Sequence, residues 1–165
     1  MLTGSRKLKD EDLTFNDITS GNIDSFKHLH TGIFPAPYPE KFFTEILKLD
    51  SDSKINKIAI LKTTRKPVAV LSARVIPTEG TKILYLTSLG CKVYNRRQGI
   101  CSFLLEKAVE WAKEHNCCRL YLHVQEGNLA ALDFYRAKDF YVEKVVPNYY
   151  SRLQPPNAFK MYRNL

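Results

Sequence analysis

A short basic turn that contains a glycine, Arg96–Gly99, comes directly before an amphipathic helix that is predicted to start near Ile100. Large apolar residues follow one face of that helix, and charged residues point away from it. Because the first N–H groups of a helix lack intrahelical acceptors and the helix dipole makes that end partly positive, an anion is stabilised there. The glycine lets the anion approach the backbone closely. The pattern favours a phosphate-binding turn, and a solvated basic turn that binds nothing is the alternative.

Three further residues have side chains that can move a proton. His123 lies near the end of an apolar strand, and Tyr85 lies in the strand before the basic turn. Parallel strands leave a crevice at their carboxyl ends, and a histidine there can accept a proton because its unperturbed pKa is about 6.5. Tyr135, on the helix after the His123 strand, carries an O–H that could protonate a leaving group. The alternative is that these are satisfied core residues.

A proline-rich loop with two aromatic residues, Phe34–Pro39, follows the first predicted helix. Proline fixes φ and restricts the residue before it, so the prolines end the helix and stiffen the chain. Such a loop is either a packed crossover between two helices or a rigid apolar wall of a binding pocket. The residues alone leave both interpretations open.

Hydrophobic periodicity predicts one domain over residues 1–165, built of helices and a mixed sheet, with a flexible charged segment at 1–11. Helices are expected over 23–32, 40–49, 129–138 and from about 99, and strands over 13–15, 57–61, 67–76, 82–91, 119–125, 140–146 and 157–162. The three strands between 57 and 91 are expected to be antiparallel neighbours, because short turns join them. A helical crossover separates the strands 82–91 and 119–125, which predicts that these two run parallel.

The composition is that of a globular chain, since 44% of the 165 residues are hydrophobic. The net charge of +8 suits an acidic ligand, but the basic residues are scattered, which disfavours direct reading of a nucleic-acid sequence. No segment is apolar enough for a signal peptide or a membrane span, so a soluble intracellular protein is expected. None of the four cysteines has metal-ligand spacing, and reduced thiols are expected.

The residues that could do chemistry fit one class of reaction. The sequence shows no Ser/His/Asp pattern and no His/Glu metal pattern. A phosphate-binding turn, a candidate base and a stiff aromatic loop, without a metal site, point to group transfer from a phosphate-bearing carrier. Acyl-coenzyme A is a carrier of this kind.

The basic turn also carries a family resemblance, because residues 96–101 resemble the acetyl-coenzyme A signature (Arg/Gln)-x-x-Gly-x-(Gly/Ala) of the GNAT superfamily. The predicted order of elements matches the GNAT acyl-CoA N-acyltransferase fold, an α/β mixed sheet of about seven strands flanked by four helices. From about Asp17 onward the chain is further similar to the San-type N-alpha-acetyltransferases, the catalytic subunits of N-terminal acetyltransferase E. The motifs that carry this similarity are Phe34-Pro35-x-x-Tyr38, Tyr85-x-x-x-Leu89-Gly90-Cys91, Tyr94-x-Arg96-Arg97, residues 121–125, Asn128-x-x-Ala131-x-Asp133-Phe134-Tyr135-Arg136 and Asn148-Tyr149-Tyr150.

The resemblance implies a role for each residue at a matching position. Tyr85 and His123 would act together, through ordered water, as the general base, and Tyr135 would be the third catalytic residue. Coenzyme contacts are implied for Leu89, Cys91, Arg96, Arg97, Gln98, Gly99, Ile100, Cys101, Ser102, Asn128 and Tyr135. Peptide contacts are implied for Phe34, Pro35, Ala36, Tyr38, Tyr85, Thr87, His123, Tyr149 and Tyr150.

The implied activity is direct transfer of acetyl from acetyl-CoA, without a metal, to protein N-termini that keep Met before a hydrophobic residue. The implied partners are a peptide or protein N-terminus, the subunits of the NatA complex and the ribosome, with no membrane. The implied location is the cytoplasm, with the nucleus in addition. Two other functions stay open, a lysine or small-amine acetyltransferase and a catalytically weak scaffold subunit.

Two positions depart from the family pattern. Cys101 stands where the signature ends in Gly or Ala, which predicts weakened or shifted coenzyme binding. Asp139 stands where the family commonly has a glycine, and Asp tolerates left-handed backbone better than most residues, so the turn is expected to survive.

Overall fold

The computed structural model describes residues 6–165, which form two compact units that share three elements. One unit comprises Met1–Arg74 and Thr87–Trp111, and the other comprises Val75–Leu86 and Ala112–Leu165. These are called the phosphate-turn unit and the histidine unit below, after the residues that each contains. The assignment of residues 1–165 to a single domain stays a prediction.

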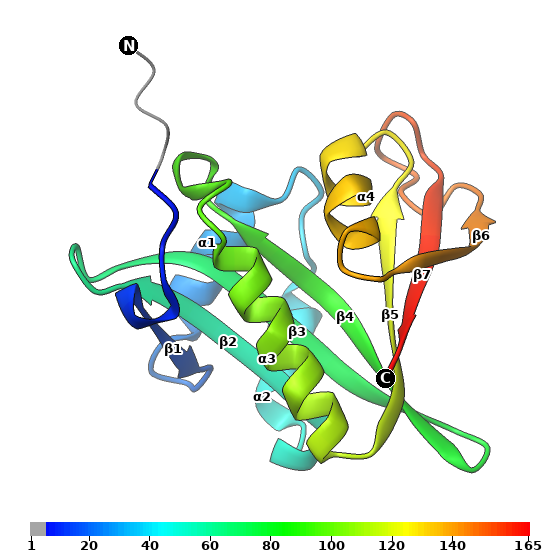
Figure 1. The fold of residues 1–165 in the computed structure, drawn as a ribbon, viewed down its shortest axis with the longest axis horizontal. Helices are drawn as coiled ribbons and strands as arrows, with labels where there is room; N and C mark the ends of the chain where they lie inside the picture. Colours follow the sequence, from blue (N-terminus) through cyan, green and yellow to red (C-terminus); the bar gives the residue numbers. More distant parts are fainter. Residues whose placement is uncertain (1–5) are drawn as a thin grey trace. The chain divides into compact units, whose positions relative to one another are not determined.

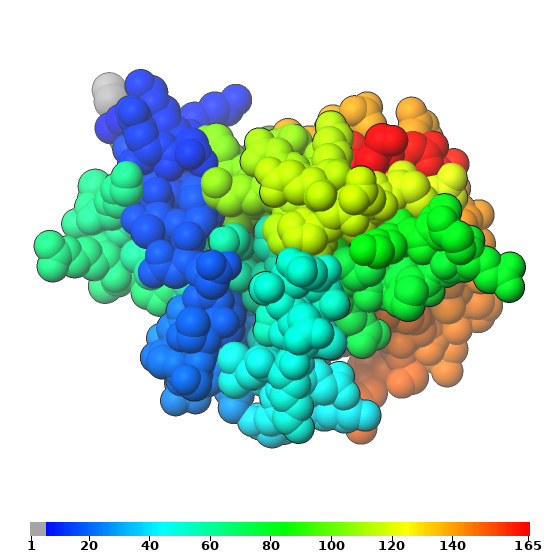
Figure 2. Space-filling model, turned by 90° about the horizontal axis from the view of Figure 1, so that it is seen from below, coloured from blue at the N-terminus to red at the C-terminus, as the bar shows by residue number. Residues whose placement is uncertain are grey.

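The phosphate-turn unit holds the first helices and strands of the chain (Figure 1). Its elements are β1 (Leu13–Asp17), α1 (Ile23–Ile33), α2 (Glu40–Lys48), β2 (Lys54–Leu61), most of β3 (Lys66–Thr78), the end of β4 (Thr81–Cys91) and most of α3 (Ile100–Glu114), with short 3-10 turns at Asp10–Asp12, Ser51–Ser53 and Val93–Asn95. α1 and α2 lie side by side at the surface seen in Figure 2, in blue and cyan.

The histidine unit holds the rest of β3, β4 and α3 and the last elements of the chain. These are β5 (Cys117–Gln125), α4 (Leu129–Arg136), β6 (Tyr141–Val146) and β7 (Ala158–Asn164). β7 pairs with both β5 and β6 in antiparallel fashion, so the last strand of the chain lies between its two predecessors.

The sheet has seven strands in the order β1-β2-β3-β4-β5-β7-β6, as the sequence predicts in number. β1 and β3 both pair antiparallel with β2. β4 and β5 pair in parallel, with Tyr85 opposite Tyr121, which confirms the orientation expected from the helical crossover. Together with the four α-helices of residues 6–165, this is the mixed α/β architecture that the sequence predicts.

The predicted elements are all present, and the differences lie at their ends. β2 begins at Lys54, three residues before the predicted Lys57, because Lys54 still pairs with Arg74 of β3. α4 ends at Arg136, before the predicted Lys138. Asp139, in the turn that follows, has φ 62°, so this Asp adopts the left-handed backbone that was expected of it.

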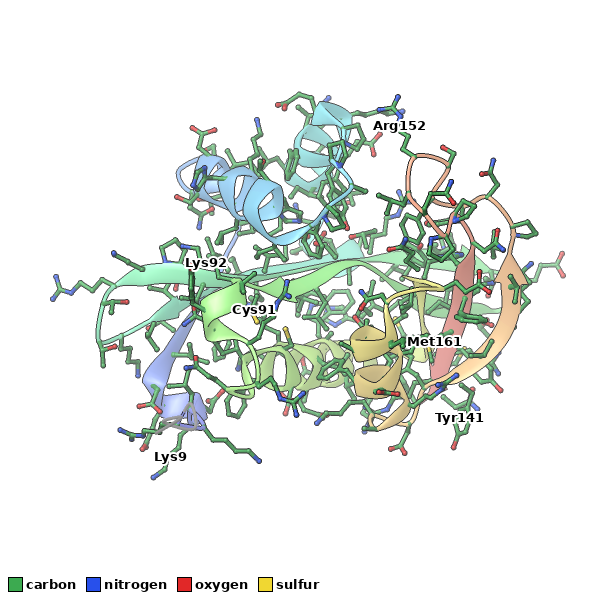
Figure 3. The ribbon with its side chains drawn as sticks, turned by 90° about the horizontal axis from the view of Figure 1, so that it is seen from above. Lys9, Cys91, Lys92, Tyr141, Arg152 and Met161 are labelled. Atoms are coloured by element: carbon green, nitrogen blue, oxygen red, sulfur yellow. The ribbon has the colours of Figure 1, made fainter. Side chains whose placement is uncertain are left out.

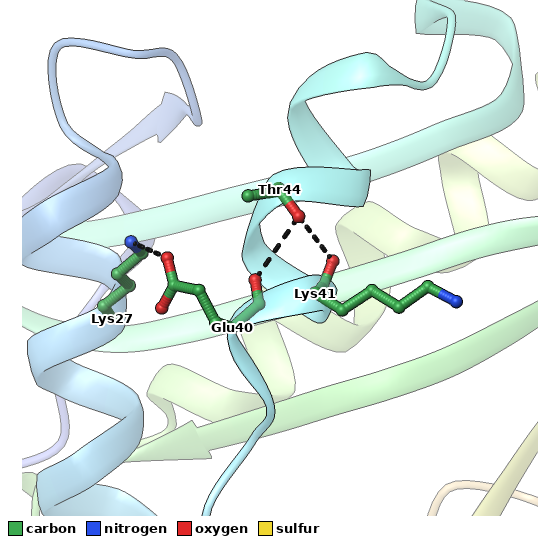
Figure 4. A network of polar contacts seen from close by, with 4 residues as sticks. All are labelled: Lys27, Glu40, Lys41 and Thr44. Atoms are coloured by element: carbon green, nitrogen blue, oxygen red, sulfur yellow. Dashed lines mark hydrogen bonds and ion pairs between the residues drawn. The ribbon is translucent and has the colours of Figure 1, made fainter.

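α1 and α2 are joined by apolar packing and by polar contacts. Phe26, Leu29 and Ile33 of α1 share a buried cluster with Phe43 and Ile46 of α2. At the surface the Lys27 ammonium pairs with the Glu40 carboxylate, and the Thr44 hydroxyl bonds the backbone of α2 (Figure 4). The loop between the two helices is therefore held at both ends.

The described part of the N-terminal segment follows a defined path. The amide of Leu8 donates to the carbonyl of Gln98, at 3.0 Å, and the amide of Lys62 donates to the carbonyl of Asp12, also at 3.0 Å. The flexibility predicted for residues 1–11 stays a prediction, and its first five residues lie outside the described part. Within residues 6–165 no helix has both the length and the apolar character needed to cross a membrane.

Candidate active site

Tyr85 and His123 meet in the histidine unit, on the neighbouring strands β4 and β5. Tyr85 lies opposite Tyr121 in the parallel ladder, and His123 follows Tyr121 by two residues, so the two side chains share one face of the sheet. The Tyr85 hydroxyl lies 2.6 Å from Nδ1 of His123. The predicted pair is therefore joined by a direct hydrogen bond, and its action on the amine through ordered water stays a prediction.

Tyr149, in the loop between β6 and β7, completes this cluster. Its ring stacks on the His123 imidazole, with centroids 4.1 Å apart and planes at 5°, and its hydroxyl lies 3.1 Å from that of Tyr85. The next residue, Tyr150, donates its hydroxyl to the carbonyl of His123 at 3.3 Å. The sequence assigned these two tyrosines to peptide contacts alone, whereas the structure also makes them partners of the candidate base.

Burial and nearby charges tune the groups of this cluster. Burial lowers the pKa of His123, and the ammonium groups of Lys160 and Lys144 lower it further, while Glu143 opposes them. Lys160 lies directly opposite His123 in the β5–β7 ladder, which explains its influence. His123 is therefore a neutral imidazole at neutral pH. Burial raises the pKa of Tyr150 to about 12, so Tyr150 stays a hydrogen-bond donor.

This arrangement can carry a proton over two side chains. When Tyr85 donates to Nδ1 of the neutral imidazole, the imidazole proton lies on Nε2, and the Tyr85 oxygen can itself accept a hydrogen bond. A proton that arrives at the Tyr85 oxygen releases the original one to Nδ1. Because Tyr149 covers one face of the ring, it holds the imidazole in the plane that this transfer requires.

The other predicted residues of the histidine unit are on α4. The side chain of Asn128 accepts a hydrogen bond from the amide of Ala131 at 3.2 Å, which caps the helix. Tyr135 is half-buried, and its ring packs edge-on against Phe134 and Phe140. Both residues thus have a structural role in α4, and their coenzyme contacts stay a prediction.

The basic turn, in the other unit, has the backbone that a phosphate site needs. α3 begins at Ile100, directly after the turn, and its first N–H groups point out of the helix end. Gly99 has φ 91°, and a Cβ there would meet Phe103 only at ordinary contact distance, so this position requires glycine for its conformation. Arg96 and Arg97 are exposed, and Arg97 is itself left-handed, at φ 62°.

Cys101 lies in the first turn of α3 and contacts a second thiol. Its side chain hydrogen-bonds the thiol of Cys91, the last residue of β4, which Figure 3 labels. This bond and burial raise the pKa of Cys101 well above its usual range, so it remains a neutral thiol. Of the other predicted coenzyme contacts, Leu89 on β4 and Ser102 on α3 are half-buried.

The proline-rich loop is anchored on β4 of the same unit. The Tyr38 hydroxyl donates to the carbonyl of Thr87 at 2.8 Å, and the rings of Phe34 and Tyr38 pack on each other and on the α1–α2 core. Gly90 allows this approach, because a Cβ there would lie 2.7 Å from Ile33 and 3.0 Å from Phe34. The loop is thus a packed crossover whose aromatic residues stay half exposed, while Pro35 is exposed and Ala36 is half-buried.

Beside this loop the phosphate-turn unit has a cavity of about 380 Å³. It lies between α2 and strands β2 and β3, and Pro39, Phe42 and Thr87 are among its lining residues. Its floor carries a buried polar pair, in which the Ser72 hydroxyl donates to the side-chain oxygen of Asn56 at 2.6 Å. Thr87 is thus the one predicted peptide contact that also borders this cavity.

The sequence reasoning missed a second histidine, His30 in α1. Its imidazole is 2% exposed, donates from Nδ1 to the carbonyl of Phe26 and accepts the hydroxyl of Ser88 at Nε2. Burial lowers its pKa to about 4, so it is a neutral structural group. Its position four residues after Phe26, on the apolar face of the helix, is the signal that could have placed it in the core.

Comparison with known proteins agrees with this fold and these motifs. Residues 23–140, which include parts of both units, match the sequence model of the Acetyltransferase (GNAT) family. N-alpha-acetyltransferase 50 of Danio rerio is 32% identical over 93% of this chain and 89% of its own length. The probable N-acetyltransferase san of Drosophila melanogaster is 31% identical over 93% of this chain and 81% of its own length.

Among solved structures, the chain resembles Arabidopsis thaliana Naa50 in complex with the bisubstrate analogue CoA-Ac-MVNAL. The TM-score is 0.83 at 24% sequence identity, over 93% of this chain and 99% of that one. At this identity the likeness concerns the fold. The family match over most of the chain and the curated relatives identify the protein as a member of the GNAT acetyltransferase family.

Proposed function

We propose that the protein is an N-terminal acetyltransferase that moves the acetyl group of acetyl-CoA to the α-amine of a protein N-terminus. The observation that supports this activity most directly is the Tyr85–His123–Tyr149 cluster, a polar proton-accepting group in a chain of the GNAT family. The similarity to N-alpha-acetyltransferase 50 favours the α-amine as acceptor.

The two units would contribute different parts of the reaction. In the phosphate-turn unit, Arg96, Arg97 and the open N–H groups at Ile100 would hold the pyrophosphate of the coenzyme. Binding energy gained at this remote end positions the thioester. In the histidine unit, Tyr85 and His123 would take the proton of the amine, and Tyr135 would donate one to the departing sulfur.

The proposed step is a direct transfer without an acyl-enzyme. The amine nitrogen attacks the thioester carbonyl carbon, an N–C bond forms and the C–S bond breaks. The amine proton passes to the Tyr85 oxygen as the Tyr85 proton passes to Nδ1 of His123, and the thiolate of coenzyme A takes up one proton. An α-amine has a pKa of about 7.7–8.0, so a modest base suffices, whereas a lysine amine, at about 10.4, needs a stronger one.

The proposed acceptors keep their initiator Met, followed by a hydrophobic residue. The loop from Phe34 to Pro39 supports this preference, because it presents stiff, half-exposed aromatic side chains that suit a thioether. Tyr149 and Tyr150 would contact the peptide from the histidine unit. Docking on a NatA-type auxiliary subunit at the ribosome, and a cytoplasmic and nuclear location, are further parts of the proposal that rest on the family resemblance.

The direct test is acetyl transfer from acetyl-CoA to a peptide panel that begins Met-Leu or Ser-Ser, or that presents lysine behind a blocked N-terminus. We expect the largest kcat/KM for Met-Leu. The Arg96→Gln variant should bind coenzyme more weakly in calorimetry. Lys113→Gln, which removes one exposed charge from the last turn of α3, serves as its control. Unchanged coenzyme affinity in Arg96→Gln would refute the placement of the pyrophosphate.

Other outcomes of this panel would select the other functions. Transfer to lysine that exceeds transfer to Met-Leu would make the protein a lysine acetyltransferase. Tight coenzyme binding with no transfer to any peptide would make it a scaffold subunit.

A further inference from the structure

The N-terminal segment brings additional positive charge to the phosphate turn. Its Leu8 amide donates to the carbonyl of Gln98, the residue between Arg97 and Gly99. Figure 1 shows this dark blue segment beside the green loop that follows β4. The contact joins residues 90 positions apart in the sequence, and Leu8 lies outside the segment 23–140 that the family match covers. Lys7 and Arg6, the described residues that precede Leu8, are therefore one and two residues away from a contact with the turn.

The cations that flank this contact along the two segments are called the basic cluster below. It consists of Arg6, Lys7, Arg96 and Arg97, all of them exposed. Among the residues that the structure describes, no carboxylate forms an ion pair with any of the four. Like charges that are brought together without counter-ions repel each other, so this cluster favours an anionic ligand.

The acidic residues of the segment lie on the other side of its anchor. Asp10, Glu11 and Asp12 follow Leu8 in a short 3-10 turn. The Asp12 carboxylate accepts the amide of Lys9 at 2.8 Å, and Glu11 lies 3.8 Å from the Lys9 ammonium. Lys9, which Figure 3 labels, thus has its counter-ion within the segment, and the positive charge of Arg6 and Lys7 is left for the turn.

We propose that Arg6 and Lys7 bind the 3′-phosphate of coenzyme A and make the protein discriminate between coenzyme A and its 3′-dephospho form. This inference rests on the proposed use of acetyl-CoA. The basic turn and the N-terminal end of α3 are the proposed binding site of the pyrophosphate, which lies in the middle of the coenzyme. The 3′-phosphate is a monoester, with a charge of about −1.5 to −2 at neutral pH, and it needs further cations. The basic cluster supplies them on the side of the turn that faces the N-terminal segment.

The test is calorimetric binding of coenzyme A and of 3′-dephospho-coenzyme A to the full chain. The variant Arg6→Gln/Lys7→Gln should lose about fivefold in affinity for coenzyme A and change little for the dephospho form. Lys41→Gln/Lys48→Gln on α2 removes the same charge from exposed positions of the same unit and should leave the ratio of the two affinities at the wild-type value. The conservative swap Arg6→Lys/Lys7→Arg should keep the discrimination.

Each outcome decides the inference. Equal loss for the two ligands, or no loss in Arg6→Gln/Lys7→Gln, would overturn it while leaving the proposed acetyl transfer intact. A wild-type chain that binds neither ligand would overturn both the inference and the proposed function. Because all the substituted side chains are exposed, the variants are expected to fold, which circular dichroism checks.

Discussion

Two histidines of this protein lie in aromatic surroundings, and only one of them has partners that suit proton transfer. His30 is surrounded by five aromatic side chains of α1, α2 and the loop between them, with ring centroids at 4.4–5.6 Å. Both of its nitrogens are used, one by the carbonyl of Phe26 and one by the Ser88 hydroxyl. His123 is half-buried, and its imidazole contacts the Tyr85 hydroxyl and the Tyr149 ring.

The difference lies in the partners and in access to water. Ser88 and a backbone carbonyl fix the tautomer of His30 inside a core that no acceptor amine can enter. Tyr85 instead links His123 to Tyr149, which is 44% exposed, so a proton can arrive from outside. An aromatic cluster around a histidine therefore indicates catalysis only where the hydrogen-bond chain reaches the surface.

The largest expected effect is on the rate of transfer. Tyr85→Phe keeps the ring and removes the hydroxyl that bonds His123, so kcat should fall by about 10²-fold. Steady-state kinetics with a Met-Leu peptide measures this, and calorimetry should show unchanged coenzyme affinity. Tyr121→Phe, a buried tyrosine on β5 in the same unit, is the matched control, and a similar loss there would mean that the effect is structural.

The buried histidine should act on stability and not on rate. The folded pKa of His30, about 4, lies below the unfolded value of 6.5, so the unfolded chain binds more protons between these values. The contribution of neutral His30 to the free energy of unfolding is therefore fully present above pH 6.5. It falls by about 3 kcal/mol as the pH drops to 4. Urea unfolding across this range should show a shallower decline in His30→Gln than in the exposed control His28→Gln.

A smaller effect is expected where the proline-rich loop approaches β4. In Gly90→Ala the new methyl group would lie 2.7 Å from Ile33 and 3.0 Å from Phe34, so the loop must shift, at a cost of about 1–3 kcal/mol. The KM for the Met-Leu peptide should rise. In Gly32→Ala, at a helical position with open space, the melting temperature should stay the same or rise, and KM should change little. Equal KM values in both variants would show that the loop does not contribute to peptide binding.

The smallest effect should be a shift of the pH profile. Lys160 lowers the pKa of His123, so Lys160→Met should raise that pKa and move the acid limb of kcat to higher pH. The direction follows because the base works only when it is neutral. Lys138→Gln, on a lysine of the same unit that does not influence His123, should leave the limb in place. A limb that stays in place in Lys160→Met would show that the titrating group is not His123.

The elements and the candidate base could be predicted from the sequence because both follow from local patterns. The apolar spacing from Ile100 onward predicted α3, and the position of His123 near the end of β5 favoured it as a candidate base, a role that stays a prediction. The contact of Leu8 with Gln98 left no such sign, since a backbone hydrogen bond across 90 residues depends on the path of the whole chain. The stacking of Tyr149 on His123 depends likewise on how the β6–β7 loop folds back.

The contact of Cys101 with Cys91 belongs to the same class of long-range features. From the sequence, the Cys101 side chain was expected to crowd the phosphate turn, because the family signature has Gly or Ala at this position. In the structure its thiol is turned to Cys91, where burial keeps it protonated. The predicted weakening of coenzyme binding stays a prediction, which Cys101→Ala tests by calorimetry.

His123 and His30 have distinct roles if His123 alone accepts the amine proton. The measurement that tests this distinction most directly is the single-turnover rate of acetyl transfer to a Met-Leu peptide in His123→Gln and His30→Gln, with acetyl-CoA and peptide at saturation. We predict a loss of about 10²-fold or more in His123→Gln and a change of less than about threefold in His30→Gln. Equal rates in the two variants would contradict the assignment of His123 as the proton acceptor.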